Sequence, residues 1–199
     1  MDARKNIIFQ LVNTEWNQDY LSRLPHHSFM DLSIIYSYLS DDIPLQADII
    51  TNESPGLNQI SKYELFDLAF VNTRRLLSPV VMPMLEILKN FEVTGSASLC
   101  SEFNNLLVIS NQHGFFGAAS IMYKDVLYEI SCKLKSDFYI LPSSVHECLI
   151  TPVYLFDNPY ELMEVVKAVN KESVKLTERL SNHVYYYDRS TRVITVSTS

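Results

Sequence analysis

The chain of 199 residues has the composition of a folded globular protein, with 47% hydrophobic and 20% charged residues. This length suits one domain, or one domain with an appendage, and is enough to bury a core without disulfides or metal ions. The net charge is −7 and the 16 basic residues are scattered. This argues against a protein that binds nucleic acid through its phosphates, which needs clustered Lys and Arg.

The N-terminal part of the chain predicts a helix followed by a β-hairpin. Residues 3–24 carry apolar side chains at helical spacing, and Pro25 ends that pattern. Apolar and polar residues then alternate over 31–39 and again over 45–51. Because residues 41–44 have the composition of a turn, the two alternating runs predict a hairpin.

Two further helices are expected before residue 90. Ser61 and Glu64 have the spacing of a capping box, in which the serine accepts a backbone N–H and the glutamate reaches back. An apolar helical pattern follows directly. Pro79 and Pro83 interrupt the next stretch, which is expected to resume as a helix through Leu88.

The second half of the chain has the clearer pattern. Residues 106–110 and 117–123 are expected to pair as strands around a turn at Asn111–Gly114. Spacings of three and four predict helices, and short alternating runs predict strands. The predicted elements are helices at 124–135 and 161–170, and strands at 138–141, 183–188 and 192–197, of which the last two form a terminal hairpin.

Strands joined mainly by hairpins, with helices between them, predict an α+β fold with a mainly antiparallel sheet. The helices are expected to pack against one side of that sheet. We expect a single module over residues 1–199, with a possible division into two sub-lobes, 1–90 and 105–199, joined by a loop near 90–104.

The most conspicuous polar segment runs from Asp137 to Glu147. Ser143 or Ser144, with His146 and a carboxylate, suggests a nucleophilic site in which histidine deprotonates serine and Asp137 or Glu147 orients the imidazole. The small residues that flank the serine of a nucleophile elbow are missing. Ser144 and Glu147 fit a second capping box instead, at the start of a helix. The preferred interpretation is the cap, and catalysis or anion binding at the helix N-terminus is the alternative.

The histidines do not form a metal-binding pattern. His113 falls at a predicted turn, and no partner with ligand spacing is visible. His26 and His27 are adjacent, so in an extended chain they point to opposite sides. His183 is expected at a strand edge. We therefore expect no metal site and no cofactor.

Two other motifs favour structural roles. Tyr185–Tyr187 has the aromatic content of a base-stacking platform, but Asp188 and Arg189 cancel where a basic groove is needed. Packing within a terminal hairpin is the preferred interpretation. Gly114–Gly117 lacks the Lys and Ser/Thr of a phosphate-binding loop.

The three cysteines have no paired spacing, which favours reduced thiols and a cytoplasmic protein. The apolar segment at residues 7–12 is too short for a signal peptide and is interrupted by Gln10. The longest apolar stretch, near residues 79–88, is shorter than the ~20 residues of a membrane span. We therefore expect a soluble protein.

Five segments, taken in chain order, carry a resemblance to a known family: Phe29–Tyr36, Tyr63–Ala69, Gly117–Leu127, Ser136–Glu147 and Leu180–Tyr187. They resemble an uncharacterised family of gut Firmicutes proteins, known only as a numbered domain of unknown function (family number 5688). The resemblance covers most of residues 5–190. The resemblance implies a bacterial cytoplasmic protein and no particular activity. Family members usually carry a further segment before the first element seen here, so this chain is expected to be a short member or a truncated one.

The leading functional hypothesis is a non-enzymatic interaction or regulatory module whose partner is another protein, because tyrosine and methionine suit adaptable protein contacts. The first alternative is a small hydrolase or anion-binding enzyme that uses Ser143 or Ser144, His146, Glu147 and Asp137. The second is an inhibitor of a nucleic-acid enzyme from a mobile element. The sequence predicts neither the partner nor the oligomeric state.

Overall fold

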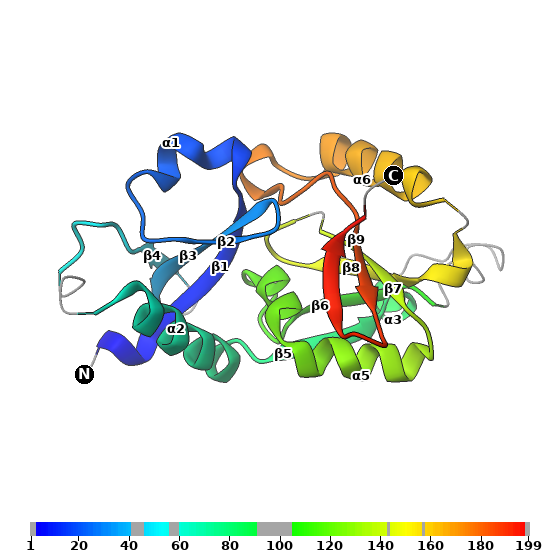
Figure 1. The fold of residues 1–199 in the computed structure, drawn as a ribbon, viewed down its shortest axis with the longest axis horizontal. Helices are drawn as coiled ribbons and strands as arrows, with labels where there is room; N and C mark the ends of the chain where they lie inside the picture. Colours follow the sequence, from blue (N-terminus) through cyan, green and yellow to red (C-terminus); the bar gives the residue numbers. More distant parts are fainter. Residues whose placement is uncertain are drawn as a thin grey trace. The chain divides into compact units, whose positions relative to one another are not determined.

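The computed structural model describes residues 3–40, 46–55, 60–90, 105–142, 144–156 and 158–197 (Figure 1). The chain divides into two compact units, Met1–Ser78 and Pro79–Ser199. Each unit contains an antiparallel sheet with helices, so the predicted α+β fold is confirmed.

The first unit contains a sheet built around β3 (Leu32–Leu39). One edge of β3 pairs with β1 (Ile7–Asn13), and the other pairs with β2 (His27–Phe29) and β4 (Ala47–Ile49), all antiparallel. The predicted hairpin is confirmed by the β3–β4 register, and its turn, residues 41–45, lies outside the described residues.

The predicted helix over residues 3–24 is wrong. The segment contains η1 (Ala3–Asn6), β1, η2 (Glu15–Asn17) and only a four-residue helix, α1 (Gln18–Leu21). The stretch from Ile7 to Leu11 is buried without a break. A short apolar run buried on both faces cannot be told from a buried helix by its period, and pairing with the distant strand β3 makes it a strand.

Helix α2 (Lys62–Leu76) starts at the predicted capping box. The N–H of Glu64 donates to Ser61 Oγ (3.2 Å), and the N–H of Ser61 donates to Glu64 Oε2 (2.9 Å). The helix lies beside β1, where the N–H of Phe9 donates to Thr73 Oγ1 (2.9 Å) (Figure 1). The capping prediction at Ser61 is therefore confirmed.

The second unit contains a six-stranded antiparallel sheet. Its order is β10-β9-β7-β8-β6-β5, and the terminal hairpin β9–β10 is as predicted. The strands are β5 (Pro79–Pro83), β6 (Leu107–Asn111), β7 (Phe138–Leu141), β8 (Cys148–Pro152), β9 (Tyr185–Asp188) and β10 (Val193–Val196).

One prediction near β6 is wrong. Residues 117–123 do not return as a strand but form the 3-10 helix η4 (Gly117–Met122), and β6 pairs with β5 and β8 instead. Pro79 and Pro83, which were expected to interrupt the chain before a helix, are the two ends of the edge strand β5, a position that tolerates proline because no other described strand pairs on its outer side. The helix that follows, α3 (Met84–Asn90), is confirmed. It includes the first residue of the loop predicted near 90–104, and residues 91–104 lie outside the described residues.

Helices α5 (Lys124–Leu134) and α6 (Pro159–Ser173) occupy opposite faces of the second sheet (Figure 1). Leu162 and Val166 of α6 pack with Leu141 of β7. Helix α5 lies on the other face, where Tyr128 and Cys132 are close to Tyr187. The prediction that the helices pack against only one side of the sheet is therefore wrong for the second unit. Two short helices, η5 (Val153–Leu155) and η6 (Leu176–Glu178), complete the unit.

Two cysteines are described, and both are free: Cys132 is exposed on α5, and Cys148 is buried at the start of β8. Burial raises the pKa of the Cys148 thiol. Cys100 lies outside the described residues. Within the described part of the chain, no helix is long and apolar enough to cross a membrane.

Candidate functional site

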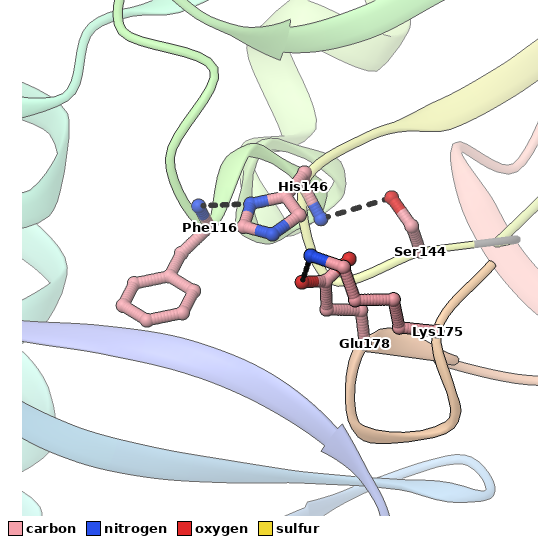
Figure 2. A network of polar contacts seen from close by, with 5 residues as sticks. All are labelled: Phe116, Ser144, His146, Lys175 and Glu178. Atoms are coloured by element: carbon pink, nitrogen blue, oxygen red, sulfur yellow. Dashed lines mark hydrogen bonds and ion pairs between the residues drawn. The ribbon is translucent and has the colours of Figure 1, made fainter.

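Within the segment Asp137–Glu147 that the sequence singled out, Ser144 is a buried residue that forms an isolated bridge with Arg179. Its hydroxyl accepts the backbone N–H groups of His146 (3.1 Å) and Glu147 (3.3 Å), and the first of these contacts is drawn in Figure 2. These are the contacts of a cap, but the strand β8 follows instead of a helix. The predicted capping box is therefore wrong, and Ser144 stabilises a turn between β7 and β8.

His146 is held by the β6–η4 loop. Its Nδ1 accepts the N–H of Phe116 (3.3 Å), and the two rings lie nearly parallel with centroids 6.1 Å apart (Figure 2). The carbonyl of His146 accepts the hydroxyl of Ser110 (2.7 Å). An Nδ1 that accepts a hydrogen bond carries no proton, so the ring hydrogen of the neutral imidazole sits on Nε2. Among the described residues, no serine hydroxyl contacts this ring.

Asp137 lies at the other end of β7 from Ser144. One carboxylate oxygen accepts the hydroxyl of Tyr186 (2.7 Å), and the other accepts the N–H of Arg189 (2.9 Å). The hydrogen bond to the Asp137 carboxylate raises the pKa of Tyr186 to about 12. Asp137 therefore fixes the β9–β10 turn and does not orient His146.

The described members of the proposed catalytic group thus do not assemble. Glu147 is exposed and contributes only its backbone N–H to Ser144. Ser143 lies outside the described residues. Ser144, His146 and Asp137 each bind a different structural partner, and no described carboxylate lies at the imidazole.

The loop that holds His146 is organised by Asn111 at the end of β6. Its side chain donates to the Phe115 carbonyl (2.7 Å) and accepts the N–H of His113 (2.9 Å). At the next turn, a Cβ on Gly117 would overlap Ser110 Oγ and the His146 carbonyl. Only glycine lets η4 approach β6 and the backbone of His146 this closely. His113 is exposed at the turn tip, as expected.

The remaining histidines also have separate structural partners. His26 Nδ1 contacts the Leu24 carbonyl (2.9 Å), while His27 Nδ1 contacts the Tyr36 hydroxyl (2.6 Å). Burial lowers the pKa of His27, and the positive charge of Lys62 adds to this effect. In the described residues, no three His, Cys, Asp or Glu side chains are grouped as metal ligands.

The tyrosine run is part of the sheet. Tyr185 and Tyr187 are buried on one face, where Phe138 stacks on Tyr187 (4.6 Å between centroids). Tyr186 lies on the opposite face and contacts Tyr139. Packing within the terminal hairpin, the preferred interpretation, is what the structure shows.

A site that the sequence did not indicate lies between helix α6 and the end of β10. This α6–β10 pocket has a volume of about 250 Å³ and is mostly apolar. No single sequence motif indicates this pocket, because the residues that line it come from three separate segments of the chain. It is lined by Pro159, Tyr160, Met163, His183, Val184, Val196 and Ser197.

Comparison with known proteins identifies the family of this chain. A family model described as a family of unknown function (DUF5688) matches residues 1–189. No curated protein and no solved structure matches the chain. Since the match spans nearly all of the 199 residues, the chain belongs to the family of unknown function DUF5688.

Proposed function

We propose that this protein is a non-enzymatic interaction module that binds a segment of another protein in the α6–β10 pocket. The observation that carries the proposal is the apolar lining of this pocket together with Tyr160, a lining residue that is itself 47% exposed. Aromatic residues and methionine are enriched at protein interfaces, and Tyr160 and Met163 supply both here. We also propose a bacterial cytoplasmic location, which the family resemblance and the unpaired cysteine spacing support.

The size of the pocket favours a side-chain anchor. Small-molecule sites usually measure ~300–1,000 Å³, whereas this pocket measures about 250 Å³. One large aliphatic or aromatic side chain fills such a space. Burying it contributes ~1.5–3 kcal/mol, enough for an anchor but not for a complete interface.

Further exposed apolar residues precede the helix. Tyr154 and Leu155 lie in η5, directly before α6 in the chain, and both are exposed. They give a partner additional apolar area on the same segment of chain as Tyr160. The expected partner is therefore a peptide segment with one large apolar anchor and further apolar residues beside it.

The enzymatic alternative finds less support. A general base needs hydrogen-bond reach to the group that it deprotonates, and a triad needs a carboxylate at the other ring nitrogen. The Ser144 hydroxyl is engaged with backbone N–H groups, and His146 is engaged with Phe116. These contacts give both residues structural roles.

The test is selection from a random linear-peptide display library on the purified protein. Enriched peptides should share one large apolar residue, and Tyr160→Glu should weaken their binding about tenfold, because a solvated charge then stands at the pocket. Tyr63→Glu is the matched control. Both tyrosines occupy the second position of a helix and are exposed, where a carboxylate suits the helix N-terminus.

Peptides that bind Tyr160→Glu and the wild type equally would contradict the proposal, as would a library without enrichment. The hydrolase hypothesis has its own readout. Labelling of Ser143 or Ser144 by a fluorophosphonate probe, lost in His146→Ala, would favour an enzyme instead.

A further inference from the structure

The two edges of the second sheet differ in chemistry. Strand β5 begins and ends with proline, which has no N–H to donate, so that edge resists the addition of another strand. Strand β10, Val193–Val196, contains neither proline nor charge, and all four residues are β-branched. Val193 is 49% exposed. The β10 edge therefore carries neither the proline nor the charged side chains that block the addition of another strand.

The backbone groups that face outward from β10 follow from its ladder. The N–H of Ser197 donates to the Val184 carbonyl (2.8 Å), so Ser197 faces β9. Backbone groups alternate sides along an antiparallel strand. Thr195 therefore also faces β9, while the N–H and C=O groups of Ile194 and Val196 point to the open edge. No other described strand pairs there.

This edge is complementary to itself. When a second β10 lies antiparallel with Thr195 opposite its own copy, Ile194 of each chain faces Val196 of the other. In both of these Ile194–Val196 pairs, the backbone N–H and C=O groups of the two residues point toward each other, as an antiparallel ladder requires. Each pair therefore exchanges two hydrogen bonds. Residues 193–197 carry no charge, so no like charges meet, and opposed threonines are a favourable cross-strand pair.

We propose that two copies of this chain associate through β10, edge to edge about a two-fold axis at Thr195. The contact is isologous, since the same strand serves both copies. It joins the two second-unit sheets into one continuous antiparallel sheet. The proposal uses backbone groups and does not depend on what occupies the α6–β10 pocket.

The test measures the mass in solution by sedimentation and by native mass spectrometry. The wild type should dimerise with increasing concentration. Thr195→Lys and Thr195→Glu should each weaken self-association about tenfold, because the axis places two like charges face to face. An equimolar mixture of the two variants should recover a heterodimer, since the opposed charges are then complementary.

Two controls separate this inference from the proposed function. Thr191→Lys adds the same charge in the exposed turn, outside the paired residues, and should leave the dimer intact. Tyr160→Glu should bind the selected peptides about tenfold more weakly and still dimerise. Thr195 is itself exposed, so its variants should keep the wild-type circular dichroism spectrum.

A wild type that stays monomeric at all concentrations overturns the proposal. So does a dimer that tolerates Thr195→Lys, or a mixture of the two charge variants that remains monomeric. A monomer that binds library peptides sensitive to Thr195→Lys would show that the edge receives a foreign strand instead.

Discussion

Ser61–Glu64 and Ser144–Glu147 have the same serine-to-glutamate spacing, but the chain behaves differently after them. In both, the serine hydroxyl accepts the N–H of the residue three positions ahead, at 3.2 Å and 3.3 Å. Only Glu64 returns a hydrogen bond to its serine, and only there does a helix follow. The residues after Glu64 have helical periodicity, whereas Cys148–Pro152 is a short apolar run that ends in proline. The local motif therefore sets the turn, and the following residues decide between helix and strand.

The largest expected effect is at Gly117, because the Ser144–His146 segment depends on tertiary support that the Ser61 box does not need. A methyl group there would overlap the His146 carbonyl and lie 2.8 Å from the Asn111 nitrogen, and backbone atoms cannot rotate away. Gly117→Ala should lower the free energy of unfolding by about 3 kcal/mol, measured in urea. Gly114→Ala is the control for glycine loss in the same loop: its φ of +62° strains alanine, but nothing crowds the added methyl. If Gly117→Ala costs no more than Gly114→Ala, the packing argument fails.

The two serines should differ next. Ser144→Ala removes the acceptor of two N–H groups at a buried position and should cost about 2 kcal/mol. Ser61→Ala, at an exposed cap, should cost about 1 kcal/mol. Urea unfolding of both variants tests the order, and a larger cost for Ser61→Ala would mean that the turn at Ser144 is held by other contacts.

Asp137 was grouped with Ser144 by sequence, but the structure assigns it to Tyr186. Tyr186→Phe should cost about 1 kcal/mol at neutral pH. The folded-state pKa of Tyr186 is raised to about 12. The hydrogen bond from Tyr186 to Asp137 therefore makes its full contribution to folding stability at pH values below the usual tyrosine pKa near 10. That contribution is lost as the pH rises through about 12. The difference between wild type and Tyr186→Phe, followed by urea unfolding at increasing pH, should close over that window. A difference that persists would contradict the assigned bond.

The smallest effect should separate the two glutamates. Hydrogen bonds from Ser61 hold the pKa of Glu64 below its usual value. A lowered pKa means that the stabilisation is present above the usual value and is lost as the pH falls. Glu64→Gln should therefore lower the melting temperature slightly at neutral pH, and the difference should shrink as the pH falls below the usual glutamate pKa of about 4.3. Glu147→Gln should have no effect at either pH, and an equal effect in both would break the distinction.

Local pattern was sufficient where an element's neighbours in sequence determine it. Helices α2, α5 and α6 bury one face at regular spacing, and the hairpins β3–β4 and β9–β10 pair across short connections, so all were predicted. Strand β1 was missed because its partner β3 is distant in sequence, and nothing local distinguishes a buried strand from a buried helix.

The candidate site was harder to predict, for the same reason. Sequence proximity placed Asp137 near His146, but the intervening strand β7 carries them to opposite ends. His146 is fixed by Phe116, thirty positions earlier in the chain. The α6–β10 pocket joins residues from 159 to 197 that share no motif. Tertiary geometry alone brings these residues together.

The buried thiol of Cys148 allows local opening of the second unit to be measured by alkylation of a native residue. A solvent-borne alkylating reagent reaches this sulfur only when β8 separates from its neighbours, whereas exposed Cys132 reacts in the native state. When closing is fast relative to alkylation, the ratio of the observed rate at Cys148 to that of a free thiol gives the population of the open form. Peptide mapping after a timed alkylation pulse would then yield the opening free energy of β8 without denaturant and without any engineered label.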